Sequence, residues 1–437
     1  MPLQPTFGEH TINALSLMFR DRQINLDPGF QRRSVWTWND RRRLIQSIVS
    51  GYPVPSIFLY QRQTNGRLIY DVIDGKQRLE TIFMFTKQGR FKRDWFDAKL
   101  DLGDGLEWYN WNEIRKSFSE VRGAIEAYKL QTVQVTGDLN QIIDLFVRIN
   151  STGKRLTSGE KRHARFFTSP FLLEAERLVI KFHRFLREER ILSPAQIDRM
   201  KGTELFAELL MSIHKGGPIN KKTSLDRAIG NEDINGNTLA RLSREFKKTM
   251  GLIRRMFRHP SRGLTLKQTR FHNTAEFYSL FLLVWEMDKD NLVLADKRRN
   301  RVAFAILRKL STGVDELREQ LRKARPAKAN QKLYADYLLT VQGDTDSSAN
   351  RERRREILRN LLVSLFQRKD DKRGFTPEQR RILWNKDEKR GCRRCGRPLS
   401  WDKVTVDHVL AHTKGGKTTL GNAQLMCRSC NSRKGAR

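Results

Sequence analysis

The sequence is poor in acidic residues relative to its basic ones. Its 437 residues include 49 Asp and Glu against 84 Lys and Arg, which gives a formal net charge of +35. A chain with this excess of cations attracts polyanions, so nucleic acid is the partner that we expect. The length predicts two to four domains, and a hydrophobic content of 38% excludes a disordered polymer.

Cysteine and long apolar runs are also scarce. The most apolar run, FYSLFLLVWEM at 277–287, is too short to cross a bilayer and is typical of a buried helix. The first residues, MPLQPTFGEH, lack the pattern of a signal peptide. All 4 cysteines lie between 392 and 430, which argues against a disulfide framework and for metal ligation in a reducing compartment. We therefore expect a soluble, cytoplasmic protein without a membrane partner.

Periodicity predicts an α+β multidomain fold. Residues 1–165 are expected to form an α/β domain, because the β-rich runs SIFLYQ and RLIYDVI flank a Thr-Asn-Gly turn and predict a hairpin over 56–75. The segment KQRLETIFMFTKQ predicts a helix directly after it. A further strand is expected over 128–138, followed by a helix over 139–150.

Residues 166–370 are predicted to be a helical domain, and 371–437 a small C-terminal domain. Apolar residues recur at intervals of three and four over 274–288, 297–309 and 353–367, among other segments. The segment TELFAELLMSIHKGG predicts a helix capped by Thr203. Small polar residues over 341–355 predict a linker.

The cysteines form two pairs, each separated by two residues, with 31 residues between the pairs. Two such pairs are typical of a structural zinc site in which each pair forms a knuckle around a tetrahedral ion. A segment of this size builds little core, so zinc is expected to supply part of its folding free energy. The predicted ligands are Cys392, Cys395, Cys427 and Cys430.

An acid–histidine pair, Asp407-His408, lies between the two cysteine pairs, with Asn422 after it and Asn431 directly after the last cysteine. The segment predicts a strand, a loop, a second strand and a terminal helix. With its Gly pair, GNAQLMC and CN..KG ending, it resembles the HNH nuclease family over about 388–437. That resemblance implies a ββα-metal fold with a zinc knuckle.

The resemblance implies a role for each polar residue of this segment. His408 would be the general base, since a neutral imidazole can take a proton from water near pH 7. Asp407 and Asn431 would hold one Mg²⁺ or Mn²⁺, and Asn422 would brace the loop and orient His408. His412 either contacts phosphate or is an incidental loop histidine. The alternative is a zinc module that binds DNA without hydrolysing it.

The segment YDVIDGKQRLETI places Asp74 and Gly75 between a predicted strand and a predicted helix. Glycine allows close backbone approach, a helix N-terminus offers amide donors, and Lys76 and Arg78 add positive charge, a pattern compatible with phosphate binding. Many structural strand–helix turns have the same pattern.

Three segments, FQRRSVW, IDGKQRLET and FVRINSTGKRLTSGE, resemble in order a bacterial family that carries a DGQQR motif on a ParB/sulfiredoxin-like fold. It occurs in Gmr-type modification-dependent restriction systems and Ssp-type defence, where the domain binds and hydrolyses nucleoside triphosphate and gates a nuclease. Lys76 stands where the family usually has a glutamine, which favours nucleotide binding over turnover. The implied nucleotide-site residues are Asp74, Gly75, Lys76, Gln77 and Arg78, with Gln31, Arg32, Arg148 and Asn150 as secondary candidates.

The resemblances together imply an anti-phage, restriction-type DNA endonuclease that is gated by GTP or ATP and acts on modified phage DNA. Metal-dependent HNH enzymes usually leave 5′-phosphate and 3′-hydroxyl ends. One such domain per chain implies either nicking or a homodimer. Two alternatives are a mobile-element nuclease without a sensor role and a ParB-like DNA-binding regulator without hydrolysis.

Overall fold

A computed structural model describes residues 3–30, 36–103, 105–149, 156–220, 225–226, 229, 234–257, 265–294, 297–324 and 326–434. The chain forms two compact units, which are described separately. The first comprises residues 1–176 and 193–204, and the second comprises residues 177–192 and 205–437. Within the described residues, no helix is both long and apolar enough to cross a membrane.

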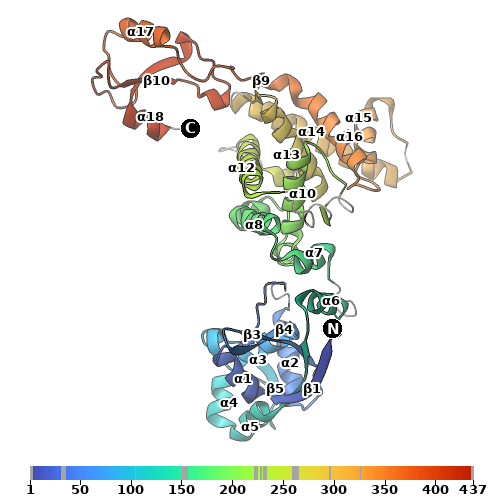
Figure 1. Cartoon of the computed structure of the whole chain (residues 1–437). Helices are drawn as coiled ribbons and strands as arrows, with labels where there is room; N and C mark the ends of the chain where they lie inside the picture. Colours follow the sequence, from blue (N-terminus) through green and yellow to red (C-terminus); the bar gives the residue numbers. More distant parts are fainter. Residues whose placement is uncertain are drawn as a thin grey trace. The chain divides into compact units, whose positions relative to one another are not determined.

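A five-stranded mixed sheet forms the centre of the first unit, in the order β1-β7-β3-β4-β2. Figure 1 labels its strands β1, β3 and β4 in blue. The predicted hairpin is present, and its turn consists of Asn65 and Gly66, which both have positive φ. The pairs β1–β7 and β3–β4 are antiparallel, whereas β7–β3 and β4–β2 are parallel. The strands are β1 (Gln4–Thr11), β2 (Ile24–Asn25), β3 (Ile57–Thr64), β4 (Arg67–Asp74) and β7 (Lys129–Thr136).

Helices cover both faces of this sheet because neighbouring strand residues point to opposite sides. Val72 packs in the core with helices α1, α2 and α3, whereas Ile73 packs in a second core with α6. A small β5–β6 ribbon and helices α4 and α5 extend the first core. The bounds are α1 (Ile12–Arg20), α2 (Trp38–Val49), α3 (Lys76–Phe85), β5 (Ala98–Asp101), β6 (Leu106–Tyr109), α4 (Trp111–Ser117), α5 (Ser119–Ala127), α6 (Leu139–Ile149), α7 (Ser158–Phe166) and α9 (Pro194–Asp198).

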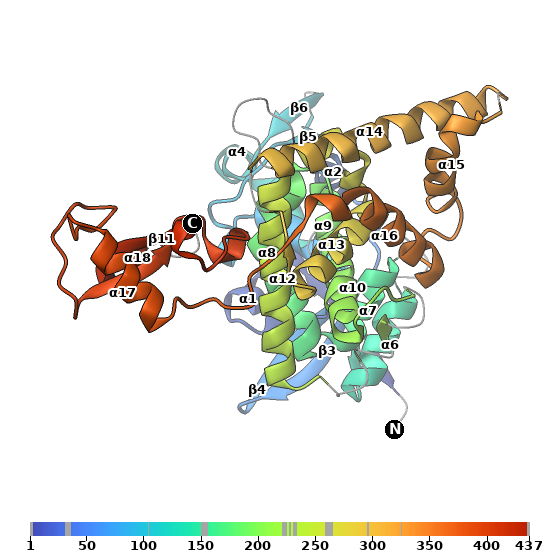
Figure 2. The ribbon, with the colours of Figure 1, turned by 90° about the horizontal axis from the view of Figure 1, so that it is seen from above.

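The second unit is helical in its middle part, where long helices pack side by side (Figure 2). The apolar run at 277–287 lies in α13, and all of its residues except Glu286 are buried, as predicted. The short strands β8 (Leu292–Val293) and β9 (Gln367–Arg368) pair beside it. The helices are α8 (Pro170–Glu188) and α10 (Lys201–Lys215), which both begin in the first unit, and α12 (Gly236–Phe257), α13 (Thr274–Lys289), α14 (Lys297–Arg322), α15 (Lys332–Leu339) and α16 (Ser348–Leu362).

Two sequence predictions in this region are wrong. Helix α10 begins at Lys201, so Thr203 is a buried residue inside it and not its cap. The linker predicted over 341–355 ends early, because Ser347 caps α16 and that helix runs through the rest of the segment. The basic run 351–355 within α16 is partly buried, since Arg351 and Arg354 are 2% and 0% exposed.

The buried arginines hold α16 to its neighbours. Arg351 donates to Glu208 Oε2 at 2.6 Å and to the Ile219 carbonyl at 2.9 Å, and its guanidinium lies 3.8 Å from the ring centroid of Tyr278. Arg354 donates to Ser279 Oγ at 3.0 Å. Ion pairs and hydrogen bonds offset the free-energy cost of burying these charges. Removal of one partner leaves a buried charge without compensation and is strongly destabilising.

Arg351→Ala is expected to lower the free energy of unfolding of the second unit by about 3–5 kcal/mol, because it removes the cation from the buried Glu208 carboxylate. Arg353 provides the control, since its side chain is 53% exposed and pairs with Asp336 on the surface. Arg353→Ala should cost less than about 1 kcal/mol. Urea denaturation followed by tryptophan fluorescence measures both variants, and equal effects would contradict the structural role.

The C-terminal part of the second unit has the predicted order of strand, loop, strand and helix. Strands β10 (Val404–His408) and β11 (Ala423–Cys427) pair antiparallel, and α18 (Arg428–Lys434) follows directly. Helix α17 (Pro377–Lys386) begins at a Thr376 cap and contacts β11. The fold is therefore α+β, with a mixed-sheet region, a helical middle and a small β-hairpin region that carries the four cysteines.

Candidate metal centre and active site

The four cysteines converge beside the C-terminal hairpin. Their Sγ atoms all lie within 4.8 Å of one another, and no other group of three or more His, Cys, Asp or Glu ligands is found among the residues that the structure describes. A tetrahedral zinc ion with bonds of about 2.3 Å separates its sulfur ligands by about 3.8 Å. The Sγ atoms of Cys395 and Cys427 are 4.0 Å apart, so the cluster fits such an ion.

The electrostatics of the thiols also favour a cation. Burial raises the pKa of Cys392, but N–H donors of Cys427, Cys395 and Arg394 lower it to about 6. Burial and the neighbouring thiols raise the pKa of Cys430 to about 11. Adjacent thiolates repel one another, so full ionisation of the cluster requires a bound divalent ion. The donor set is consistent with structural zinc.

The hairpin places Asp407 on the side that faces α18. Thr405 and Asp407 lie two residues apart on β10 and so share one face. Asn431 Nδ2 donates to Thr405 Oγ1 at 3.1 Å, and Lys434 Nζ donates to Asp407 Oδ2 at 2.5 Å. Asn431 and Lys434 are three residues apart on α18, so Asp407 and Asn431 belong to the same side of the hairpin.

This side offers one carboxylate and one amide oxygen, the kinds of ligand that Mg²⁺ prefers. The Asp407 carboxylate forms an ion pair with the Lys434 ammonium through Oδ2. Gln424 Nε2 lies 3.4 Å from the same Oδ2 atom. Asp407 and Asn431 are the residues that would hold a divalent ion on this side, and such an ion would compete with Lys434 for the Asp407 carboxylate.

His408 lies on the opposite side of the strand and is 6% exposed. Its Nε2 is 3.0 Å from Thr418 Oγ1, its ring centroid is 4.5 Å from that of Phe375, and the His412 ring is 5.7 Å away. Burial lowers the pKa of His408, as do His412 and Lys434, while Asp407 and Asp370 raise it. The net shift favours the neutral imidazole, which is the form that can accept a proton.

Asn422 fixes the loop between the strands. Its Oδ1 accepts from the Leu410 N–H at 2.8 Å, and its Nδ2 donates to the carbonyls of Leu410 at 3.0 Å and Lys417 at 2.9 Å. Gly416 is required here, because a Cβ at that position would overlap the Leu410 carbonyl. These contacts agree with a loop-bracing role for Asn422. His412 Nε2 lies 2.7 Å from the Asp370 carbonyl.

The structure brings the residues of the DGKQR segment into one turn in the first unit. Asp74 ends β4, Gly75 has a φ of 91°, and α3 begins at Lys76 without a side-chain cap. Only glycine suits this position, because a Cβ would also collide with Ile57. Arg78 Nη2 donates to Asp74 Oδ2 at 2.6 Å and to the Ser56 carbonyl at 3.1 Å.

The polar side chains of this turn also have protein partners. Lys76 Nζ lies 2.6 Å from Asp27 Oδ1, and Gln77 Oε1 accepts from the Trp36 N–H at 2.6 Å. Burial alone would raise the pKa of the Asp27 carboxyl. Hydrogen bonds and positive charge from Lys76 and Arg90 outweigh burial, so the pKa is lowered overall. A nucleotide phosphate near Lys76 would compete with this carboxylate.

Of the four secondary candidates for the nucleotide site, the structure describes only Arg148. Arg148 is exposed in the last turn of α6, on the other face of the sheet from α3. Gln31, Arg32 and Asn150 lie outside the described residues.

Two family models match the chain. Residues 15–167 match the GmrSD restriction endonuclease N-terminal domain, and residues 392–437 match the HNH endonuclease. The chain combines a GmrSD N-terminal domain with a C-terminal HNH endonuclease domain. Curated proteins yield no match. The HNH match spans the cysteine cluster, the hairpin and α18, and both matches imply DNA as substrate.

Three residues at the HNH site were not predicted from the sequence. Lys434 follows Asn431 by one helical turn, and this spacing could have indicated that it faces Asp407. Thr418 lies in the loop after the Gly pair and contacts His408. Asp370 lies upstream of the matched segment, and its carboxylate accepts from the Thr418 N–H at 2.7 Å, a contact that lowers its pKa. No local pattern marks the last two residues.

Proposed function

We propose that this chain is an anti-phage DNA endonuclease of restriction type, in which the HNH domain hydrolyses a phosphodiester bond and the N-terminal domain gates it by binding nucleotide. The observation that carries the proposal is the HNH hairpin itself. It presents a buried histidine, whose pKa burial lowers, on one face and a carboxylate on the other, where the Asn431 amide of α18 lies, beside a four-cysteine cluster.

The residues of this hairpin have complementary roles in the proposed reaction. His408 takes a proton from the attacking water. Asp407 and Asn431 would hold Mg²⁺ or Mn²⁺, and the bound ion would supply positive charge to the phosphate in the transition state. Lys434 adds a second positive charge on the same side. Asn422 keeps the loop after His408 in place.

The helical middle region is proposed to bind DNA and to couple the two ends of the chain. The net charge of +35 supports binding to a polyanion. Since one HNH domain per chain has one hydrolytic centre, a monomer would nick DNA, and a double-strand cut would need a homodimer.

The GmrSD N-terminal domain is proposed to have a ParB/sulfiredoxin-like fold and to bind GTP or ATP at the DGKQR turn. An uncapped N-terminus on α3, a glycine with positive φ and two nearby cations support phosphate binding there. The secondary candidates Gln31, Arg32, Arg148 and Asn150 would contribute from neighbouring segments.

Arg78→Gln is expected to weaken nucleotide binding about tenfold, which corresponds to about 1.4 kcal/mol for the loss of one charged contact to phosphate. Arg67→Gln is the control, because Arg67 is exposed at the start of β4 in the same domain. Fluorescence anisotropy of labelled GTP and ATP measures both. Unchanged affinity in Arg78→Gln would remove this turn from the nucleotide site.

Gating and modification sensing are tested on DNA. The full-length protein is incubated with unmodified, glucosylated, hydroxymethylated and phosphorothioated DNA and Mg²⁺, each with and without GTP or ATP. Cleavage that depends on a modification and on nucleotide is expected. Cleavage indifferent to both would favour the mobile-element nuclease. Binding without cleavage would favour the ParB-like regulator.

A further inference from the structure

A short segment upstream of the matched HNH residues completes the surroundings of His408. This connector, residues 369–376, links β9 to α17. Asp370 Oδ2 accepts from the Thr418 N–H at 2.7 Å, and the Asp370 carbonyl accepts from His412 Nε2 at 2.7 Å. Phe375 packs against the His408 ring. The histidine is thus enclosed by its own loop and by the connector.

The connector also determines which nitrogen of His408 carries the proton. The Thr418 hydroxyl donates its only hydrogen to the Lys372 carbonyl, because a carbonyl can only accept. Its oxygen, 3.0 Å from His408 Nε2, must then accept a hydrogen from that nitrogen. Neutral His408 therefore has its hydrogen on Nε2 and its lone pair on Nδ1.

The other end of the connector is anchored to the helical region of the same unit. The Lys369 N–H donates to the Asn291 carbonyl at 2.7 Å, and Lys369 Nζ lies 2.7 Å from Asp288 Oδ1. Both side chains of this ion pair are largely buried. The hydrogen-bonded path therefore runs from the end of α13 through Asp370 and Thr418 to His408.

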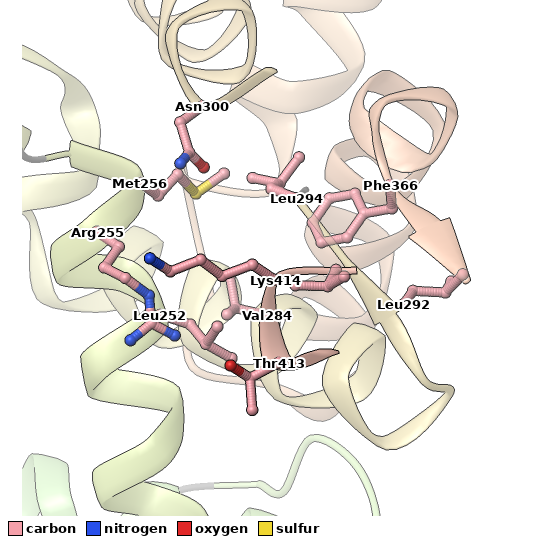
Figure 3. A pocket seen from close by; sticks show the side chains of 11 residues that line it. Leu252, Arg255, Met256, Val284, Leu292, Leu294, Asn300, Phe366, Thr413 and Lys414 are labelled. Atoms are coloured by element: carbon pink, nitrogen blue, oxygen red, sulfur yellow. The ribbon is translucent and has the colours of Figure 1, made fainter. Parts of the chain in front are cut away.

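A second contact joins the nuclease loop to the helical region. Thr413 and Lys414 line a pocket with Leu252, Arg255 and Met256 of α12 and with residues of α13, α14 and β8 (Figure 3). Thr413 and Lys414 directly follow His412, which is itself bonded to the connector. The loop and the connector are thus held by the same helices.

We propose that Thr418 is the positioning residue for His408 and that the connector makes the geometry of the base depend on the helical region. The proposal rests on the proposed nuclease function. The Thr418 hydroxyl holds the imidazole so that Nδ1 is the nitrogen that accepts the proton, and Asp370 holds Thr418. The functional nuclease domain therefore begins at the connector and not at Cys392.

The tautomer is measured without reference to cleavage. Nuclear magnetic resonance of full-length protein with ¹⁵N-labelled histidine distinguishes a protonated Nε2 from a protonated Nδ1, and His408→Ala identifies the signal of His408. We expect the Nε2-protonated form in the wild type and a mixture of tautomers in Thr418→Val. A wild-type His408 protonated on Nδ1 would overturn the assignment.

Plasmid cleavage provides the second readout. Thr418→Val is expected to lower kcat about 10- to 100-fold, with KM for DNA changed less than about twofold, since the buried hydroxyl orients the base. Thr418→Ser, which keeps the hydroxyl, should restore most of kcat. Thr419→Val is the matched control, because Thr419 is exposed and makes no side-chain cap bond. Equal kcat for Thr418→Val and Thr419→Val would overturn the role.

Two substitutions in the connector test its contribution to the rate of cleavage. Asp370→Ala removes the acceptor for the Thr418 N–H and should lower kcat about tenfold, whereas Asp371→Ala, at the exposed neighbour, should not. Equal rates would overturn the connector's part. A wild-type chain with the expected tautomer that cleaves no DNA would instead contradict the proposed function and leave the Thr418 assignment standing.

Discussion

His408→Ala is expected to lower the rate of DNA cleavage about 10²- to 10⁴-fold, because it removes the proposed base for the attacking water. The substitution removes a side chain and no zinc ligand, so zinc content should be unchanged. Cleavage of supercoiled plasmid by full-length protein in Mg²⁺ measures the rate, and atomic absorption measures the zinc.

His412→Ala is the informative comparison for this variant. His412 donates to the Asp370 carbonyl, so its loss should have a much smaller effect than the loss of His408. A large, equal loss in both variants would indicate that His412 also acts on the phosphate. Cleavage by His408→Ala at the wild-type rate would remove His408 from the role of base.

Removal of zinc is expected to unfold the C-terminal region around the hairpin. Among the described residues, the buried cluster here consists of Cys392, Met426 and Cys430, with Leu399 and Cys427 packed against it, which is too small a core to fold alone. Structural zinc in comparable small sites contributes an apparent binding free energy of about 10–16 kcal/mol. Cys427→Ser should therefore lose zinc, nuclease activity and the protection of residues 392–434 from protease.

Chelators of different strength distinguish the role of the proposed Mg²⁺ from that of the proposed zinc. Brief dialysis against a weak chelator should remove Mg²⁺ but leave zinc, and activity should return when Mg²⁺ is added. A strong zinc chelator should abolish activity that Mg²⁺ alone does not restore. Full activity in Cys427→Ser, with zinc absent, would show that the cluster is dispensable for folding of the HNH domain.

The C-terminal fold was predictable because its determinants are local. The cysteine spacing, the alternation of Val404 and Val406, and the Gly pair all lie within a few residues of the elements that they specify. The contact between Asp370 and Thr418 spans 48 residues and leaves no periodic signal. Such pairings depend on how the chain returns to itself, which the local pattern does not encode.

The partners of the charged residues Lys76 and Arg351 were not predictable from the local sequence. The sequence indicated that Gly75 lies between a strand and a helix, but not that Lys76 would pair with Asp27. Similarly, the run at 351–355 is strongly basic, yet Arg351 lies in the helical core with Glu208 and Tyr278 as its partners. A charged residue is buried when a distant partner compensates it, and that partner is not evident from the local sequence.

The proposed activity is hydrolysis of DNA at a metal-dependent HNH centre. Supercoiled plasmid incubated with the full-length protein and Mg²⁺ tests it most directly, with unmodified and modified DNA, GTP or ATP, and EDTA controls. We predict nicked or linear products that DNA ligase can reseal, as 5′-phosphate and 3′-hydroxyl ends allow, and no product in EDTA. Intact plasmid under every condition, from protein that retains its zinc, would rule out the proposed nuclease activity.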